Sequence, residues 1–397
     1  FGYTGLNAAI EIARNGRSVC VIDKNDFGCG CSSKNGGQIS NLLKPSLKKL
    51  TKKYGFQKAK LIRGEGVNSV EWLIDFIKNE NFDCDLKREG RFHGAHTPFE
   101  FKKMVSESND LKENEGIETQ IIDKSDQKNE INSNLYHGGV VFPQHASLNA
   151  AKYHKDLIEK AIGLGVSVIS NCEMVDFKKK LDEFSVLTNK GPLKANNLVV
   201  ATNGYTSNVT PWLNKRNIPI GSYVIATEEL PINYISSLFP TNRHITDTCR
   251  VVYYFRPSPD RKRIIFGGRV SSREISLSKS APLLLKDLKR VFPDLPELKI
   301  SHSWMGYVSY TFDHLPHTGS EDGLYYSMGY CGSGIALSSY LGMKLGKKVI
   351  GDNDGATAFD SLKFPTRPFY NGRPWFLPAV VELYKFRDSR EMIKYMN

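Results

Sequence analysis

The sequence predicts an α/β fold in which βα units near both ends of the chain flank a separate, strand-rich layer. Gly2 and Gly5 precede an amphipathic helical pattern over residues 7–15, and the short apolar strand that follows ends at Asp23. Near the other end, a strand and a glycine-rich turn again lead into a helical pattern. Residues 219–310 lie between these units and consist mainly of strand-like runs, so we expect them to form a second layer.

The N-terminal glycines match the last two-thirds of the G-x-G-x-x-G fingerprint of Rossmann-like dinucleotide-binding units. A glycine at position 2 lets the backbone approach a pyrophosphate, and the helix N-terminus offers N–H groups to the phosphate oxygens. Asp23 stands about where a carboxylate accepts hydrogen bonds from ribose hydroxyls. The first glycine of the fingerprint and its strand would precede Phe1, so we expect the sequence to lack the start of this unit. An ordinary βα turn is the alternative interpretation.

The composition is typical of a folded globular protein. With 397 residues, of which 40% are hydrophobic and 24% charged, the chain is long enough for two connected domains. No apolar run approaches the roughly 20 residues of a membrane helix. The seven scattered cysteines indicate reduced thiols and a cytoplasmic location, and Cys29 and Cys31 are more typical of a small-residue loop than of a disulfide or metal site. The net charge of +12 comes from dispersed lysines, which indicate a solvated surface rather than a nucleic-acid partner.

The remaining elements follow from local periodicity and turn residues. A second glycine-rich loop over residues 27–40 follows Asp23 closely, and it suits a cofactor longer than a nicotinamide dinucleotide, with a second ring system. Apolar residues at helical spacing predict helices at 43–80, from His145 onward, and at 278–291. Runs rich in β-branched and aromatic residues predict strands at 87–96, 165–169, 198–200, 222–227, 251–255, 263–266, 301–304 and 324–326, and a hairpin at 184–195.

Two further turns are candidates for cofactor contacts. The strand at 198–200 breaks into the small residues 201–204, the kind of turn over which a cofactor passes at a strand end. Residues 332–334 form a glycine loop before a helix, whose N-terminus could stabilise negative charge on a reduced ring.

Several sequence blocks occur together in a specific order: G-Y-T-G-L, K-N-G-G-Q, A-T-N-G-Y, F-G-G-R, L-P-H-T-G and G-S-G. In this order the chain resembles the FAD-dependent amine oxidoreductases of the D-amino-acid oxidase and glycine oxidase superfamily, and within it the gamma-glutamylputrescine oxidase-like proteins of polyamine catabolism. The resemblance implies a Rossmann-like, glutathione-reductase-type FAD-binding domain that is discontinuous, formed by residues 1–86, 138–210 and 311–362. It also implies an inserted α+β substrate domain on a mixed sheet (87–137 and 211–310) and a C-terminal docking segment (363–397).

The resemblance implies a set of residues around FAD. The ADP part would contact Gly2, Thr4, Gly5 and Asp23, and the rest of the cofactor would contact Ser32, Ser33, Asn35, Gly36, Gly37, Gln38, Ala201, Thr202, Gly204, Gly332, Ser333 and Gly334. Sarcosine oxidase-like relatives attach flavin through a cysteine near the place where this chain has Tyr307, so we expect non-covalent FAD.

The implied reaction is oxidation of a small amine or amino-acid-derived substrate by hydride transfer to flavin N5. The imine would hydrolyse to an aldehyde, and oxygen would regenerate the flavin and yield hydrogen peroxide. Relatives place an oxygen-activating lysine on the strand at 263–266, where this chain has isoleucine. A dehydrogenase that passes electrons to another acceptor therefore stays an alternative, as does an RNA-modifying flavoprotein of the same fold.

Candidate substrate-contacting residues lie in the strand-rich layer. Arg256 and Arg269 each could bind a substrate carboxylate, and Tyr254 could shield an amine from water. Trp304 could face the flavin. The alternative reading is that the tyrosine and tryptophan pack in the core and the arginines are surface charges. We expect no metal site, because His93 and His96 lack the H-E-x-x-H pattern.

Overall fold

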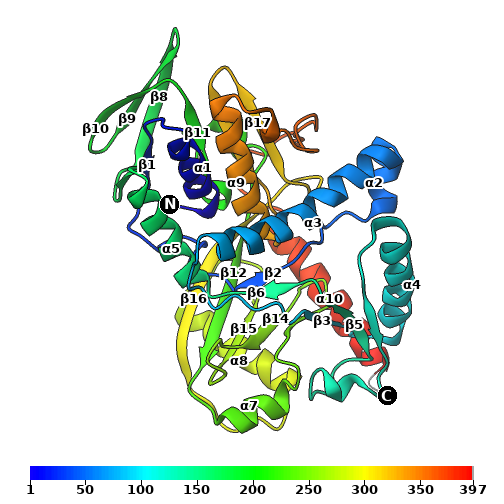
Figure 1. Ribbon diagram of the computed structural model, residues 1–397. Coiled ribbons are helices and arrows are strands. Elements are labelled where there is room, and N and C mark those ends of the chain that lie inside the picture. The colour runs from blue at the N-terminus through cyan, green and yellow to red at the C-terminus, as the bar shows by residue number, and fades with distance from the viewer. Residues whose placement is uncertain (396–397) are drawn as a thin grey trace.

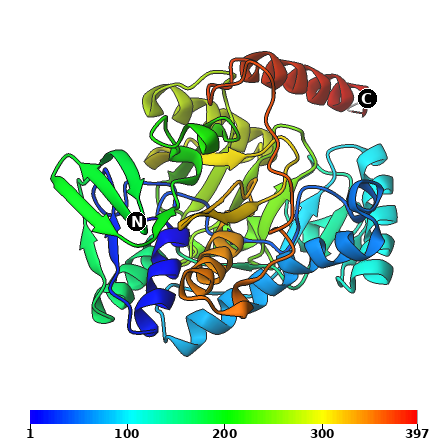
Figure 2. The ribbon, with the colours of Figure 1, turned by 90° about the horizontal axis from the view of Figure 1, so that it is seen from above.

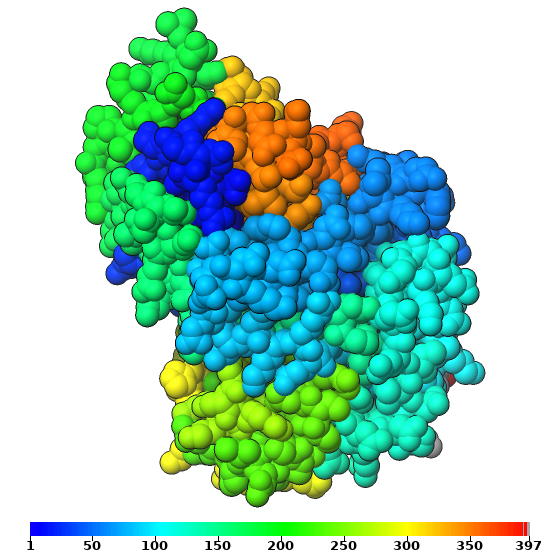
Figure 3. Space-filling view, viewed as in Figure 1, coloured from blue at the N-terminus to red at the C-terminus, as the bar shows by residue number. Residues whose placement is uncertain are grey.

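The computed structural model describes residues 1–395 and arranges them in two layers that meet along a long helix, α3 (Phe56–Asn79). One layer contains α1 (Tyr3–Arg14) packed beside α9 (Gly334–Ile350), and the other contains a large sheet (Figure 1). Figure 2, seen from above, shows the same two helices side by side near the N-terminus. In the space-filling view, residues of α3 form a band across the middle of the face shown, between the two layers (Figure 3).

The first layer is built from segments that lie far apart in the sequence. β1 (Cys20–Ile22) pairs in parallel with β7 (Ser167–Ile169). β11 (Leu198–Val200) pairs in parallel with β18 (Leu324–Met328), which pairs antiparallel with β17 (His317–Glu321). β8 (Met174–Lys180), β9 (Glu183–Thr188) and β10 (Gly191–Ala195) form a separate antiparallel sheet, and β9 and β10 are the predicted hairpin. The parallel pairs of distant strands confirm the prediction of a discontinuous α/β unit.

The helix α1 is amphipathic, as its spacing predicts. Leu6, Ala9 and Ile10 are buried against Tyr153 and Leu157 of α5 (Ala150–Gly163). The helix α1 also packs closely on α9, because Gly342 and Gly346 of α9 lie against its backbone.

The helix predicted from His145 onward is observed, but it begins later than predicted because the chain at Ala146 and Ser147 is still extended. β6 (Ala146–Ser147) pairs with β2 (Gln38–Ile39). The helix α5 begins at Ala150, where the Asn149 side chain accepts hydrogen bonds from the backbone N–H groups of Ala151 (3.2 Å) and Lys152 (3.3 Å). An asparagine cap of this kind satisfies N–H groups that have no partner within the helix.

The large sheet is mixed, as predicted, and has eight strands in the order β16-β12-β15-β14-β13-β3-β5-β4. Only the β13–β3 pair is parallel. The strands are β3 (Arg91–Gly94), β4 (Gln120–Ile122), β5 (Gly139–Phe142), β12 (Ile218–Thr227), β13 (His244–Asp247), β14 (Tyr254–Pro257), β15 (Ile264–Gly268) and β16 (Ile300–Tyr310). By its pairing β5 belongs to this sheet, although it lies in the segment 138–210 that the sequence assigns to the cofactor domain.

The two faces of the large sheet have different surroundings. α7 (Ile232–Leu238) and α8 (Leu277–Val291) cover one face, where Phe92, Ile245, Phe255 and Phe266 form a core with Leu284. Because side chains alternate along a strand, the neighbours of Phe92 and Ile245 point to the opposite face. That second face looks toward the first layer and carries the polar residues of the site.

The predicted helix at 43–80 is two helices, α2 (Leu47–Tyr54) and α3, because Gly55 between them has φ +79°. α4 (Pro98–Glu115) follows Thr97, whose side chain caps its first turn. Short elements complete the chain: α6 (Pro211–Asn214) and three 3-10 turns, η1 (Gln127–Asn129), η2 (Asn203–Tyr205) and η3 (Asn353–Gly355).

The C-terminal segment forms a helix, α10 (Leu377–Tyr395), which the sequence patterns did not predict. Arg250 binds the carboxylates of Asp388 (2.8 Å) and Glu391 (2.7 Å), and Lys385 Nζ donates to the Val270 carbonyl (2.7 Å). These contacts hold α10 along an edge of the molecule (Figure 2). Within residues 1–395, no helix is both long and apolar enough to cross a bilayer.

Candidate active site

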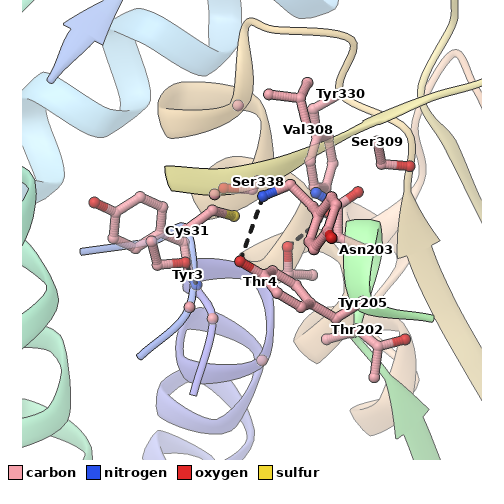
Figure 4. A pocket seen from close by; sticks show the side chains of 18 of the residues that line it. Tyr3, Thr4, Cys31, Thr202, Asn203, Tyr205, Val308, Ser309, Tyr330 and Ser338 are labelled. Carbon is pink, nitrogen blue, oxygen red and sulfur yellow. Dashed lines mark hydrogen bonds between the residues drawn. The ribbon is translucent and has the colours of Figure 1, made fainter. Parts of the chain in front are cut away.

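A cavity of about 1780 Å³ is lined by residues of both layers. The first layer contributes the start of α1, the ends of β1 and β11 and the start of α9, and the large sheet contributes β3, β12, β13, β14 and β16. Figure 4 shows part of this space, surrounded by Thr4, Cys31, Tyr205, Val308 and Tyr330. The Thr4 and Tyr330 hydroxyl groups are hydrogen-bonded at 2.6 Å, which joins α1 to the turn before α9.

The N-terminus of α1 faces this cavity and, in the described chain, carries no side-chain cap. Gly2 is extended, with φ −74° and ψ 163°. The Tyr3 N–H donates to Ser32 Oγ (3.2 Å), which brings the second glycine-rich loop against the start of the helix. A Cβ added to Gly5 would lie 3.5 Å from Ala201 Cβ, so the turn after β11 packs closely on the same helix start.

Asn35 organises the second glycine-rich loop. Its Nδ2 donates to the carbonyls of Cys31 (3.0 Å) and Ser32 (2.9 Å), and its Oδ1 accepts from the Gly37 N–H (2.8 Å). Gly37 has φ +68°, and a Cβ there would collide with the Leu148 carbonyl, so this position requires glycine. The side chain of Asn35 and the backbone of Leu148, just after β6, therefore determine the conformation of this loop.

Most of the predicted cofactor residues line the cavity: Gly2, Thr4, Gly5, Asp23, Ser32, Asn35, Gly36, Gln38, Ala201, Thr202, Gly332, Ser333 and Gly334. Ser33, Gly37 and Gly204 do not. Ser33 Oγ donates to the Gly28 carbonyl (2.6 Å), which turns it into the loop. A Cβ at Gly204 would lie 2.8 Å from the Tyr307 carbonyl, so this glycine permits close packing on β16 rather than reaching the cavity.

Asp23 stands at the end of β1, where the spacing predicts an acid. Its Oδ2 accepts from the amino nitrogen of Phe1 (2.6 Å), and its Oδ1 accepts from the Asn25 N–H (3.0 Å).

The start of α9 is a second helix N-terminus at the cavity. Ser333 Oγ donates to the Leu42 carbonyl (2.9 Å), and no side chain caps the helix within the described residues. Gly332 has φ +100°, and a Cβ there would lie 4.0 Å from Cε of Lys44. The exposed Lys44 side chain thus adds a positive charge next to this positive helix end.

Two of the four candidate substrate-contacting residues line the cavity. The Tyr254 hydroxyl is hydrogen-bonded to Ser222 Oγ (2.8 Å), and burial raises the pKa of Tyr254 to about 12, so the phenol stays protonated at neutral pH. Arg269 is also at the cavity, but its guanidinium donates to the Gly221 carbonyl (3.0 Å) and pairs with Glu274 (3.4 Å).

The structure places Arg256 and Trp304 outside the cavity. Arg256 is 6% exposed, and its Nη2 donates to the Leu148 carbonyl (2.7 Å) behind the glycine-rich loop. Trp304 lies on β16 opposite Val224. Both residues were predicted to contact substrate or flavin. The sequence alone could not show which residues of β14 and β16 line the cavity.

A group of polar residues on β3 and β13 also lines the cavity, and the sequence patterns did not assign any of them to a substrate or cofactor site: Arg91, His93, His244 and Thr246. Arg91 and His93 alternate with the core residue Phe92, a spacing that places both on one face of the predicted strand. Burial, and next to it the charge of Arg91, lower the pKa of His93 to about 3, so this imidazole is neutral. His93 Nδ1 is hydrogen-bonded to Thr246 Oγ1 (2.8 Å).

Among the residues that the structure describes, one group of possible metal ligands occurs away from this face. The ligand atoms of His96, Asp388 and Glu391 lie within 4.8 Å of one another. Because Arg250 already binds both carboxylates, this cluster is an arginine-centred ion pair network that anchors α10.

The site fits an elongated dinucleotide. Two helix N-termini without side-chain caps, at Gly2 and Ser333, face one cavity, and glycines stand where bulkier residues would narrow it. Such helix starts stabilise phosphate groups or a negatively charged ring.

Comparisons with known proteins agree with this geometry. The family model described as FAD dependent oxidoreductase matches residues 1–347. The chain is 29% identical to the gamma-glutamylputrescine oxidoreductase of Escherichia coli over 98% of this chain and 91% of that protein. It is 27% identical to a probable oxidoreductase, OrdL, of Haemophilus influenzae over 98% of this chain and 90% of that protein.

The fold is similar to those of solved flavoenzyme structures. Glycine oxidase from Geobacillus kaustophilus superposes with a TM-score of 0.76 at 18% identity, covering 92% of this chain and 96% of that one. L-proline dehydrogenase from P. horikoshii superposes with a TM-score of 0.72 at 18% identity, covering 96% of each chain. At this level of identity the superpositions establish the fold.

Proposed function

The chain belongs to the family of FAD dependent oxidoreductases, and on that basis we propose that it oxidises the C–N bond of a small amine or amino-acid-derived substrate. The observation that carries this proposal is the shared cavity. It joins the glycine-rich segments that fit the cofactor to a polar face of the large sheet, so a substrate can lie against both. The names of relatives that act on gamma-glutamylputrescine and on glycine support an amine or amino acid as the substrate.

In this proposal the first layer holds the cofactor without a covalent bond. The start of α1 and Gly2 approach the pyrophosphate, Asp23 binds ribose hydroxyls, and the start of α9 with Lys44 lies at the electron-accepting ring. When bound, the flavin accepts a hydride from the carbon next to the substrate nitrogen.

Hydride transfer requires the uncharged form of the substrate amine. Lys44 lines the cavity next to the start of α9, and His93 on the sheet side is neutral. A positive charge near a bound amine lowers the pKa of the amine and favours loss of its proton. The protonated Tyr254 hydroxyl, held by Ser222, is a hydrogen-bond donor or acceptor that can orient a polar substrate group.

We further propose a γ-glutamyl amine as the substrate and oxygen as the electron acceptor. The extent of the cavity and the full-length similarity to the Escherichia coli relative support the first point. Oxygen as the electron acceptor competes with the dehydrogenase alternative. The chain has Ile264 and Ile265 on the strand where, by the resemblance, sarcosine oxidase-like relatives place an oxygen-activating lysine.

The experiment is a substrate panel on the purified holoenzyme: γ-glutamylputrescine, putrescine, glycine, L-proline and D-alanine. Each compound is assayed aerobically for peroxide and anaerobically with a dye acceptor. We expect turnover with γ-glutamylputrescine and stoichiometric peroxide. Dye reduction without peroxide would show a dehydrogenase, and no turnover with any amine or amino acid would contradict the proposal.

A further inference from the structure

Arg91 is a half-buried arginine at the cavity. Its side chain makes no hydrogen bond and no ion pair with the residues that the structure describes, and its Nε is buried and unpaired. Its guanidinium lies 4.7 Å from the centre of the Phe142 ring. Burial lowers the pKa of Arg91 to about 10, which still leaves the group charged at neutral pH.

The other arginines at the cavity have partners. Arg17 donates to the carbonyls of Val349 (3.1 Å) and Ile350 (3.2 Å) at the far end of α9. Arg250 binds the carboxylates on α10, and Arg269 binds Glu274 and the Gly221 carbonyl. Arg91 is therefore the cavity arginine whose donors remain available to a ligand.

The neighbours of Arg91 do not compensate its charge. His244 lies directly opposite on β13, and His93 follows on the same face of β3. Burial, and then the charge of Arg91, lower the pKa values of both His244 and His93, so both rings are neutral. His145 stacks on Phe142 with ring centres 5.1 Å apart, and it too is kept neutral by burial and by Arg91. The result is one cation among neutral imidazoles and an aromatic ring.

A partly buried cation without a counter-charge is unfavourable, and a bound anion would offset that cost. A guanidinium offers its N–H groups in a planar fork that matches the two oxygens of a carboxylate. The neutral rings around Arg91 offer no negative charge that would compete with a ligand carboxylate.

We propose that Arg91 binds a carboxylate of the substrate. This inference rests on the proposed function and narrows it: the substrate is an amine that also carries a carboxylate, such as a γ-glutamyl amine, and not a plain alkyl polyamine. Arg256 and Arg269 were predicted to bind this carboxylate, but both are bonded to protein groups. We therefore assign carboxylate binding to Arg91.

The first test measures carboxylate binding without turnover. The holoenzyme is titrated with glutarate and with its diamide, glutaramide, and the perturbation of the flavin spectrum is followed. We expect glutarate to bind, and Arg91→Gln to weaken glutarate binding by about 10- to 150-fold, since hydrogen bonds to charged groups contribute about 1.5–3 kcal/mol. Arg91→Lys keeps the positive charge but loses the planar fork of N–H groups. Its affinity for glutarate should therefore lie between those of the native protein and Arg91→Gln.

The second test uses two amines that differ only in the carboxylate, γ-glutamylputrescine and N-(4-aminobutanoyl)putrescine. Arg91→Gln should raise KM for the first compound by a similar factor and leave kcat/KM for the second within about twofold. Arg88→Gln is the matched control, because Arg88 precedes the same strand but pairs with Glu71 away from the cavity.

Three results would overturn the inference: no glutarate binding to the native holoenzyme, equal glutarate affinity in Arg91→Gln, or loss of FAD from this variant while the remaining holoenzyme binds glutarate normally. The last result would assign Arg91 to a cofactor phosphate. If glutarate binds through Arg91 but no amine reduces the flavin, the proposed function fails while the carboxylate site stands. If Arg91→Gln does not fold, Arg91→Lys provides the same comparison.

Discussion

Asp247 is a buried carboxyl group whose ionisation opposes folding. It is 1% exposed, and its Oδ1 accepts from the backbone N–H groups of Cys249 (3.2 Å) and Tyr253 (3.2 Å). Its Oδ2 has no partner among the described residues. Burial raises the pKa of Asp247 to about 7, and these hydrogen bonds only partly oppose the shift.

The effect of Asp247 on stability depends on pH, because the folded and unfolded states bind different numbers of protons. In the unfolded chain Asp titrates near pH ~4, whereas the folded chain keeps this proton up to about pH 7. Between these values the folded state binds more protons, so the contribution of Asp247 to stability falls as the pH rises through this window. Asp247→Asn should therefore raise the free energy of unfolding at pH 8, by on the order of 2–4 kcal/mol, and change it little at pH ~4.

Thermal unfolding of Asp247→Asn and of the native protein across this pH range measures the effect. Asp110→Asn, on the exposed side of α4, is the control for removing a negative charge. Parallel pH profiles for the native protein and Asp247→Asn would show that the carboxyl group is already ionised in the fold.

Two of the four cysteines that line the cavity are poorly suited to covalent attachment of FAD. These are Cys31 and Cys331, and burial raises the pKa of each thiol to about 11. Because the thiolate is the nucleophile, these thiols are poorly reactive at neutral pH. Acid precipitation should release all of the flavin into the supernatant, and flavin fluorescence that stays with the denatured chain would contradict this expectation.

At the residue scale, the sequence predicts a guanidinium for a substrate carboxylate on the strand-rich layer, but it could not choose among the arginines. Whether a given arginine is available depends on groups such as the Leu148 carbonyl and Glu274, whose proximity only the folded chain determines. Arg91 could have been noticed from its alternation with Phe92 and His93.

At the scale of elements, the contact between α1 and α9 fixes the position of the start of α1, where we propose that the pyrophosphate binds. A Cβ on Gly342 would lie 2.5 Å from the Thr4 carbonyl oxygen, and one on Gly346 would lie 2.7 Å from the Ala8 carbonyl oxygen. These two glycines, one helical turn apart, let α9 pack directly on the backbone of α1.

Gly342→Ala should push the start of α1 away from the cavity. We expect a destabilisation of about 1–3 kcal/mol, typical of overpacking, together with weaker FAD binding, because Thr4 and Gly5 belong to the same turn. Denaturant unfolding and FAD titration of the apoprotein measure the two effects.

Gly64→Ala is the matched control. Gly64 lies inside the helix α3, and an added Cβ meets no atom within 4 Å. This substitution should leave FAD affinity unchanged and stabilise slightly, as expected for replacing glycine in a helix. If Gly342→Ala and Gly64→Ala have the same free energy of unfolding and the same FAD affinity, α9 accommodates the added methyl group without moving α1.

The elements that the sequence predicted well are those with local signals. Residues close together in the sequence determine the apolar face of α1 and the turn of the β9–β10 hairpin. By contrast, the helix predicted from His145 begins only at Ala150, because β6 pairs with β2 before it. The helix α10 was not predicted, because its apolar and charged residues are mixed and distant contacts with Arg250 hold it in place.

At the scale of the whole molecule, the site depends on segments that the fold brings together. Glycine-rich turns near residues 2–5, 32–38 and 332–334 surround one cavity, and the large sheet closes its other side. Motif order predicted this convergence, because each turn precedes or follows an element of a discontinuous α/β unit. The mixed order of the eight strands, which places β3 beside β13 and so assembles the Arg91 face, follows from long-range pairing that no local pattern specifies.

The most direct measurement of this account is the visible spectrum of the purified chain during an anaerobic titration with γ-glutamylputrescine. If one cavity holds both FAD and a carboxylate-bearing amine, the protein carries one FAD per chain, and the amine bleaches the oxidised flavin completely. A chain that stays colourless after incubation with FAD, or a flavin that remains oxidised in the presence of excess γ-glutamylputrescine and the other amines of the panel, would contradict it.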